Sequence, residues 1–271
     1  MERVVFLQVV VAGAVGAVFG SFANVVIWRL PRGESLVAPG SHCPRCGLRI
    51  AWYDNVPVLA WFLLRGRCRA CGEPISWRYP LVEAASGLLW AAAVLTWGQS
   101  LRALLGIVLF YLSLILAAID FDHRRLPNVL VGILAAAGLG GAVAAAAGVP
   151  ACPLVGSARG AGAVLQAGAG VFLGGGVPLV AALVYERVRG RAGLGMGDVK
   201  LLAAYGLFLG PYVLMVLFIG SIAGAAFGLA APRRARDAAI PFGPFLALGA
   251  VTTALWGEHL LVAYLRLAGL R

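Results

Sequence analysis

Long apolar runs separated by short polar or basic segments make up most of the chain. The first run extends from Val4 to Trp28, and most later runs approach the roughly 20 apolar residues with which a helix crosses a bilayer. No small-residue cleavage pattern follows the first run, so we expect it to be retained as a membrane span. The pattern predicts eight spans, over residues 4–28, 80–97, 101–119, 129–149, 161–185, 198–209, 212–231 and a last one that ends near residue 265.

Residues 29–79 interrupt this pattern with polar, basic, Pro- and Gly-rich sequence. Two Cys-x-x-Cys motifs, each followed by glycine and separated by 21 residues, lie in this segment: Cys43, Cys46, Cys68 and Cys71. Four thiolates at this spacing suit a closed tetrahedral zinc site, whose metal contributes to folding. A pair of disulfides or a redox motif is the weaker alternative, because the arginines of the segment indicate the reducing cytoplasm. We therefore predict structural Zn²⁺ here.

Composition and charge fit this arrangement. Hydrophobic residues make up 61% of the chain and charged residues 12%, whereas a soluble domain has about 25% charged residues. We predict an all-α polytopic membrane protein with about eight transmembrane helices and a small cytoplasmic zinc-ribbon-like insertion. Its expected domains are the first transmembrane helix (1–28), the metal-binding domain (29–79) and a membrane domain (80–271). The net charge of +11 reflects basic loops of the positive-inside kind, so we expect membrane lipid and no nucleic acid as partner.

Acidic residues stand at two membrane boundaries. Asp198 follows three alternating glycines in the stretch Gly193 to Lys200 and begins an apolar run, while Asp120 ends another. A charged side chain at the bilayer centre costs roughly 2.5–3.5 kcal/mol on insertion scales, so each acid needs a reason to be there. For Asp198 the structural alternative is a helix N-cap. Asp122 lies in the basic turn beyond Asp120, where we expect a solvated ion pair.

Threading the spans with the N-terminus outside puts both acids on the cytoplasmic face, together with the metal-binding segment and the basic loop at Arg233, Arg234 and Arg236. Two carboxyl groups brought together there cannot both ionise easily, so one is expected to be protonated and one ionised. That is the arrangement of an aspartic protease. The pair titrates as a unit, and neither residue is assigned as acid or base.

The glycines before Asp198 have two interpretations. They permit either a turn with positive φ or the close approach of another backbone. Gly195 and Gly197 are therefore candidate substrate-binding residues for an extended peptide. Lys200 is a third candidate, although a lysine at this position also suits snorkelling to the lipid headgroups.

Several motifs together resemble the bacterial type IV prepilin peptidases, which are GxGD-type membrane aspartic proteases. They are Gly20-Ser-Phe-Ala-Asn-Val25, the two Cys-x-x-Cys motifs, Arg78-Tyr-Pro-Leu-Val-Glu83, Ile119-Asp120 with Leu126-Pro127-Asn128, Gly195-Met-Gly-Asp-Val-Lys200 and the late Ile240-Pro-Phe-Gly-Pro. The resemblance covers nearly the whole chain. In two places the chain departs from the pattern: Asn128 stands where many members carry Asp, and Asp54 stands where Glu is common.

The resemblance implies an activity and a location. Asp120 and Asp198 would be the catalytic pair of a transmembrane protease domain over residues 80–271. The expected substrates are prepilin and pseudopilin precursors, whose short basic leader is removed at the cytoplasmic face of the bacterial inner membrane. Many members also N-methylate the new terminus with S-adenosylmethionine, an activity associated with the cytoplasmic zinc region; no residue of this chain is assigned to that cofactor.

Two other readings compete with this one. In a zinc-ribbon membrane transporter or sensor, Asp120 and Asp198 would bind a cation, but the chain offers few further oxygen ligands at that depth. A presenilin-like protease would cut inside the bilayer and favours tyrosine before its acid, where this chain has Ile119.

Overall fold

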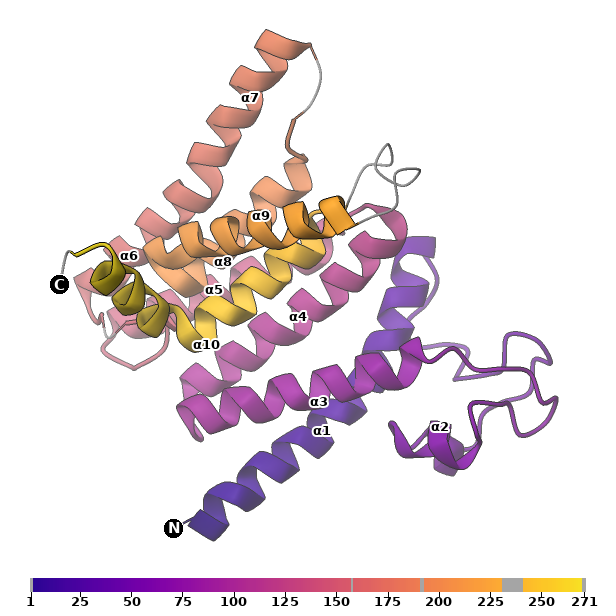
Figure 1. Cartoon of the computed structure of the whole chain (residues 1–271). Coiled ribbons are helices and arrows are strands. Elements are labelled where there is room, and N and C mark those ends of the chain that lie inside the picture. Colours follow the sequence, from indigo (N-terminus) through magenta and orange to yellow (C-terminus); the bar gives the residue numbers. More distant parts are fainter. Residues whose placement is uncertain (1, 157, 191–192, 231–240, 270–271) are drawn as a thin grey trace. The chain divides into compact units, whose positions relative to one another are not determined.

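The computed structural model describes residues 2–156, 158–190, 193–230 and 241–269, and these residues are almost entirely helical (Figure 1). They contain no β-strand beyond isolated bridges. The chain divides into two compact units, residues 1–98 and 99–271, which are described separately. Within these described residues, seven helical stretches are long and apolar enough to cross a membrane. The prediction of an all-α polytopic membrane protein is confirmed, whereas the three domain limits drawn from composition stay predictions.

In the first unit, α1 (Glu2–Arg29) packs against α3 (Arg78–Trp97). Glycines bring the two helices close together: a Cβ on Gly20 would lie 2.6 Å from Cα of Glu83, and one on Gly16 would lie 2.7 Å from the Trp90 side chain. Such small residues permit close helix packing in membranes. The Asn24 amide donates a hydrogen bond of 3.2 Å to the Tyr79 carbonyl.

The segment between α1 and α3 holds only short helical turns. These are η1 (Leu30–Arg32), η2 (Trp52–Asn55) and α2 (Leu59–Leu63). The remaining backbone forms the two cysteine motifs and their connections. With so little regular structure, the segment depends on side-chain interactions to hold its shape, and a metal ion bound by the cysteines would add to them.

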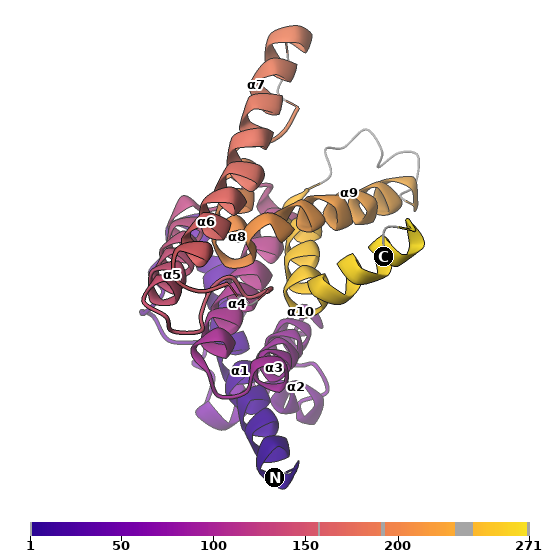
Figure 2. The ribbon, with the colours of Figure 1, turned by 90° about the vertical axis from the view of Figure 1, so that its left-hand side faces the viewer.

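In the second unit, α8 (Met196–Leu209) is the central helix, with Leu201, Leu202, Tyr205 and Phe208 fully buried. The helices around it are α4 (Leu101–His123), α5 (Asn128–Ala146), α6 (Ala161–Val171), η3 (Phe172–Gly176), α7 (Val177–Arg189), η4 (Gly210–Tyr212), α9 (Val213–Ala230) and α10 (Gly243–Leu267). Helices α6 and α7 join through η3 into one column (Figure 2). The η3 turn is π-helical, and at Gly174 a Cβ would lie 2.5 Å from the Leu202 carbonyl of α8. The glycine run there serves close packing.

The sixth and seventh predicted spans form one apolar stretch, Met196–Ala230, which accounts for seven stretches instead of eight. The helix nevertheless breaks at Gly210, whose φ is 58°, and at Pro211. Helix α9 then runs back antiparallel to α10, since Phe245 at the start of α10 packs on Phe227 near the end of α9, and Gly249 faces Val216. At about 1.5 Å per residue, α8 is shorter than the roughly 30 Å hydrocarbon layer. Helices α8 and α9 therefore form a bent pair joined at Gly210 and Pro211.

Candidate functional site

The four cysteines of the 29–79 segment come together as predicted. All four Sγ atoms lie within 4.8 Å of one another, and the Cys43 and Cys71 sulfurs are 3.8 Å apart. Ligands about 2.3 Å from a tetrahedral zinc ion are separated by about 3.8 Å, so this geometry suits a metal ion. No disulfide joins these cysteines.

Local backbone structure explains how each pair is shaped. In the first turn, the Gly47 N–H donates to the Cys43 carbonyl at 2.9 Å, and in the second the Gly72 N–H donates to the Cys68 carbonyl at 2.9 Å. Both glycines have φ near the left-handed value, 70° and 73°. Only glycine takes this conformation without strain, which is why each Cys-x-x-Cys is followed by glycine.

The environment of the thiols favours deprotonation at one of them. Backbone hydrogen bonds at Cys46 and Arg45 lower the pKa of Cys43 to about 7. At Cys71, the backbone hydrogen bond at Glu73 lowers the pKa, but burial and the neighbouring thiols outweigh it and raise the pKa to about 12. Binding of a metal ion would therefore release protons from the remaining thiols.

A bidentate ion pair ties the second cysteine turn to η2. Arg69, between Cys68 and Cys71, donates from Nη2 and Nε to the two carboxylate oxygens of Asp54 at 2.6 and 2.7 Å. The hydrogen bond from the Arg69 guanidinium holds the pKa of Asp54 below its usual value. Asp54 thus positions the cysteine turn, a role that sequence reasoning did not assign to it.

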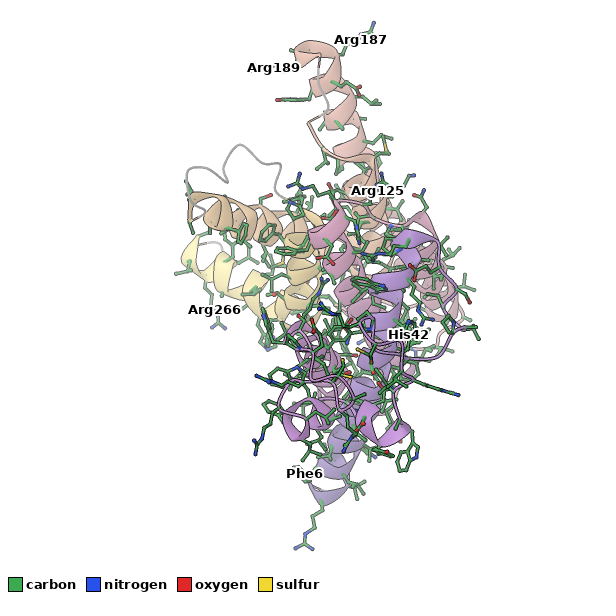
Figure 3. All side chains as sticks on the ribbon, turned by 90° about the vertical axis from the view of Figure 1, so that its right-hand side faces the viewer. Phe6, His42, Arg125, Arg187, Arg189 and Arg266 are labelled. Atoms are coloured by element: carbon green, nitrogen blue, oxygen red, sulfur yellow. The ribbon has the colours of Figure 1, made fainter. Side chains whose placement is uncertain are left out.

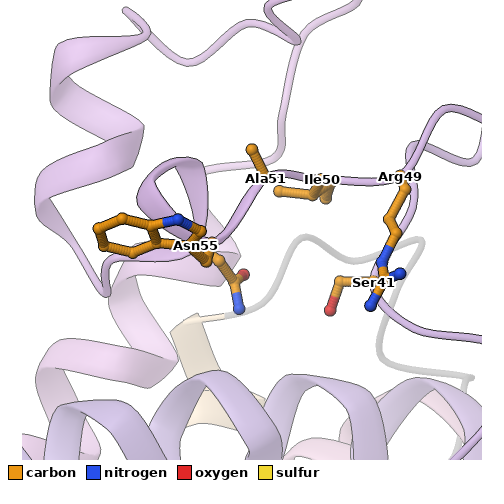
Figure 4. Close-up of a pocket in the computed structure, with 6 residues that line it drawn as sticks. Ser41, Arg49, Ile50, Ala51 and Asn55 are labelled. Carbon is orange, nitrogen blue, oxygen red and sulfur yellow. The ribbon is translucent and has the colours of Figure 1, made fainter.

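A pocket of about 450 Å³ lies beside the first cysteine turn (Figure 4). Its lining combines a guanidinium, a hydroxyl, an amide, an indole and small apolar side chains, from Arg49, Ser41, Asn55, Trp52, Ile50 and Ala51. The volume falls in the range of small-molecule sites. Sequence reasoning assigned no binding role to any residue of this pocket.

In the second unit, Asp120 occupies the last turn of α4 and is 6% exposed. Its Oδ2 accepts a hydrogen bond of 2.9 Å from the backbone N–H of Gly243, the first residue of α10. A Cβ at Gly243 would lie 2.7 Å from that oxygen, so only glycine permits this approach. Asp122, two residues later, is exposed, as its place in the basic turn predicted.

Asp198 lies in the first turn of α8 and is half-buried. An acid in this turn is favoured by the partial positive charge of the helix N-terminus. Its backbone N–H donates to the Gly195 carbonyl at 3.0 Å. The carboxyl groups of Asp198 and Asp120 interact electrostatically. The structure therefore brings together two acids that are far apart in the sequence, at the ends of two helices.

The glycines before Asp198 serve close approach. Gly195 has a φ of −65°, outside the left-handed region, and a Cβ there would lie 3.1 Å from Oδ2 of Asp198. A Cβ on Gly197 would lie 3.3 Å from Leu126. The positive-φ turn that the motif also allowed is absent at Gly195. Lys200 donates a hydrogen bond of 3.1 Å to Asn128 Oδ1 at the start of α5.

A buried hydrogen bond links the two acid-bearing helices further in. The Tyr205 hydroxyl donates to Ser113 Oγ at 2.9 Å, and both side chains are at most 1% exposed. Tyr205 lies seven residues after Asp198 and Ser113 seven residues before Asp120. Seven residues are about two helical turns. Tyr205 therefore lies on the same face of α8 as Asp198, and Ser113 lies on the same face of α4 as Asp120, each about two turns from its acid.

Comparison with known proteins places this arrangement in a family. Residues 14–97 match the family model of the bacterial peptidase A24 N-terminal domain, and residues 107–229 match that of the type IV leader peptidase family. A prepilin leader peptidase/N-methyltransferase of Xanthomonas campestris is 34% identical over 96% of this chain and 95% of its own length. The chain belongs to the type IV leader peptidase family.

Other members are equally similar. The prepilin leader peptidase/N-methyltransferase of Burkholderia pseudomallei strain 1026b is 38% identical over 97% of this chain and 89% of its own length. The type 4 prepilin-like proteins leader peptide-processing enzyme of Escherichia coli is 36% identical over 90% of this chain and 92% of its own length. No solved structure matches the chain significantly. The resemblance to prepilin peptidases is thus confirmed at the level of the family.

Further features of this family member were missed from sequence. Gly243 was noticed within the late Ile-Pro-Phe-Gly-Pro motif but received no role, because its contribution is a backbone N–H. Helical spacing could have identified the Ser113 and Tyr205 pair, since each hydroxyl lies on the same helix face as an acid. Glu83, an acid of the α3 span, is buried and accepts a hydrogen bond from the Val58 N–H.

Proposed function

We propose that this member of the type IV leader peptidase family is a membrane aspartic endopeptidase that removes the short basic leader of prepilins and pseudopilins, with Asp120 and Asp198 as its catalytic pair. The observation that carries the proposal is the electrostatic interaction of these two acids at the ends of α4 and α8. Both acids lie within residues 107–229, which match the peptidase family. The relatives named above are called leader peptidases, which supports the same activity here.

The geometry supports a shared-proton mechanism. Two carboxyl groups that interact electrostatically favour one ionised and one neutral member. The ionised carboxylate takes a proton from water, which attacks the scissile carbonyl carbon, while the neutral carboxyl polarises the carbonyl oxygen. The Gly243 N–H holds the Asp120 carboxyl in one orientation. The proton is shared by the pair, so acid and base are not assigned to single residues.

The glycine motif would bind the substrate next to these acids. A helical peptide bond is shielded, so the segment around the scissile bond must be extended before water can attack it. Gly195 is exposed and has extended backbone angles, φ −65° and ψ 137°, which suit pairing with an extended peptide. Gly197 and Lys200 complete this surface, and the exposed bond from Lys200 to Asn128 holds the lysine at the start of α5.

The acids and basic residues favour a cytoplasmic site in the bacterial inner membrane. Arg124 and Arg125 follow Asp120, and Arg187 and Arg189 end α7 (Figure 3). Basic residues of this kind flank the cytoplasmic ends of spans. The basic loop of Arg233, Arg234 and Arg236 lies outside the described residues. A prepilin leader in the cytoplasm would present its scissile bond at this surface.

Zn²⁺ is the metal that best fits the four-cysteine cluster. Four sulfurs that all lie within 4.8 Å of one another would fill a tetrahedral shell and leave no position for a reacting ligand, which is typical of a structural site. Its role would be to hold residues 29–79 in shape, because this segment has little regular structure of its own.

The second activity in the relatives' names, N-methylation, would be located in the first unit. The 450 Å³ pocket is large enough for S-adenosylmethionine, and its Arg49 guanidinium, Trp52 indole and Asn55 amide suit the donor's carboxylate, sulfonium and adenine groups. When bound, the cofactor would supply the methyl group. We expect Arg49→Ala and Trp52→Ala to lose methylation while cleavage continues.

Cation transport or sensing is less well supported. One oxygen of Asp120 already accepts the Gly243 N–H, and the acids lie in a region that matches a peptidase family.

The test of the proposal is incubation of the purified protein with a prepilin, followed by mass spectrometry with and without S-adenosylmethionine. We expect a product shortened by the leader in both reactions and a further methyl mass only with the cofactor. An intact prepilin in both reactions would contradict the proposal.

A further inference from the structure

Glu83 is an acid inside a membrane span that the catalytic proposal does not use. It lies five residues into α3 and is 8% exposed. Its Oε2 accepts a hydrogen bond of 2.7 Å from the Val58 backbone N–H, and the Ser21 hydroxyl of α1 also bonds its side chain. An ionisable residue at such a position calls for a named partner, and here the partner is the backbone just before α2.

The depth of Glu83 follows from the two helices on which it rests. Arg78 begins α3 and Arg29 ends α1, and basic residues of this kind mark the membrane surface. Glu83 lies about 7 Å along α3 from Arg78 at 1.5 Å per residue. Gly20, which faces Glu83, lies about 13 Å along α1 from Arg29. Both helices therefore place Glu83, and with it Val58, below the membrane surface.

Backbone in a membrane must have its polar groups satisfied, and the N–H groups of residues 58–60 meet that condition. Val58 N–H bonds Glu83, Leu59 N–H bonds the Pro57 carbonyl at 2.6 Å, and Ala60 N–H bonds the Val56 carbonyl at 3.0 Å. Pro57 has no N–H. Val58 has a φ of 63°, an unusual value for a β-branched residue, and the Glu83 bond helps to hold that conformation.

The side chains of α2 present an apolar surface at this depth. Leu59, Phe62 and Leu63 are 62%, 64% and 81% exposed, whereas Ala60 is buried. On the far side, the Trp61 indole donates to the Ile75 carbonyl at 3.0 Å and fixes the helix orientation. Arg65 and Arg67 follow directly and are exposed. Apolar side chains with flanking arginines match acyl chains below anionic headgroups.

We propose that residues 56–63 form a re-entrant membrane element, anchored by Glu83, whose Leu59, Phe62 and Leu63 contact lipid acyl chains. The element fixes the metal-binding segment to the bilayer at a point between its two membrane helices. It does not depend on the catalytic assignment of Asp120 and Asp198.

The test places the photoreactive residue p-benzoylphenylalanine at position 63 of the full chain, reconstituted in vesicles of phosphatidylethanolamine and phosphatidylglycerol. The matched control carries it at Val37, which is 90% exposed and lies in the same segment. Val37 is on the aqueous side, because Arg29 at the end of α1 bonds the carbonyls of Ser35 and Pro39 around it. After irradiation, mass spectrometry identifies the adducts.

We expect lipid adducts at position 63 and none at position 37. Adducts at position 63 only to protein, or no lipid adduct there, would overturn the proposal. In the same assay, Glu83→Gln keeps an acceptor for the Val58 N–H and should retain the lipid adduct, whereas Glu83→Ala should lose it. If Glu83→Ala fails to fold, as judged by lost metal content, the comparison of positions 63 and 37 in the otherwise unchanged chain still decides.

Discussion

The backbone N–H of Gly243 donates a hydrogen bond of 2.9 Å to Oδ2 of Asp120. This contact joins the first residue of α10 to the last turn of α4, and no side chain fits between them, because a Cβ at 243 would lie 2.7 Å from the carboxylate. The orientation of Asp120 is therefore set by a residue distant in sequence that has no side-chain chemistry of its own.

The first prediction is that Gly243→Ala lowers kcat for prepilin cleavage by about 100-fold, the cost typical of a displacement of about 1 Å in an active site. The added methyl group must push Asp120 aside. The control is Gly140→Ala in α5, where a Cβ would have no atom within 4 Å. Equal activity of Gly243→Ala and the unchanged protein, measured as initial rates with purified prepilin, would show that this contact does not position the acid.

The second prediction concerns the Tyr205–Ser113 bond as a spacer between α8 and α4. Tyr205→Phe and Ser113→Ala should each lower kcat more than they raise KM and should alter the pH profile of cleavage. Loss of the bond changes the spacing of α8 and α4, and with it the separation of the two acids. In a double-mutant cycle we expect a coupling of about 0.5–3 kcal/mol. The control is Thr253→Val, which removes a buried hydroxyl without a partner among the described residues. Additive effects of the two changes would show that the bond does not act as a spacer between the two helices.

The third prediction is that the protein binds about one Zn²⁺ per chain, as expected for a four-thiolate site. Replacement of any one of Cys43, Cys46, Cys68 or Cys71 by serine should release the metal and increase proteolysis of residues 29–79. Cys152, which is buried and apart from the cluster, is the matched control, and Cys152→Ala should keep the metal. If elemental analysis detects no zinc in protein prepared without chelators, the prediction of a zinc site is wrong.

The fourth prediction follows from the lowered pKa of Asp54, which the hydrogen bond from Arg69 causes. A lowered carboxyl pKa adds stability above the unfolded-state value of about 3.9, and this stability is lost as pH falls through the folded-state pKa. Asp54→Asn should therefore speed proteolysis of residues 29–79 by the same factor at every pH from 8 down to 5. A difference that disappeared already near pH 6 would mean that another group controls this region.

Apolar runs and short motifs were sufficient to predict most of the spans, the cysteine cluster and the positions of the two acids at helix ends. Each of these rests on local sequence: a helix-length apolar run, a Cys-x-x-Cys-Gly turn, or an acid beside a membrane boundary. The bend between α8 and α9 was only indicated by Gly210-Pro211, because whether such a pair kinks a helix or reverses it depends on packing against α10.

Contacts between residues that are distant in the sequence could not be predicted from it. Gly243 acts through its backbone, and Asp54 acts through a bidentate bond to Arg69, so neither carries a motif that names its partner. The glycines before Asp198 showed the converse: the motif was clear, but only the structure distinguishes a close approach from a left-handed turn.

The central claim is that Asp120 and Asp198 cleave the prepilin together. Its most direct test is the cleavage rate of Asp120→Asn, Asp198→Asn and Asp122→Asn, each purified with its metal content unchanged and assayed by mass spectrometry of the released leader. The account predicts at least about a 100-fold loss for each of the first two, since each removes one member of the acid–base pair, and near-normal activity for the exposed Asp122 variant. Cleavage that survives either of the first two changes, or that requires Asp122, would contradict it.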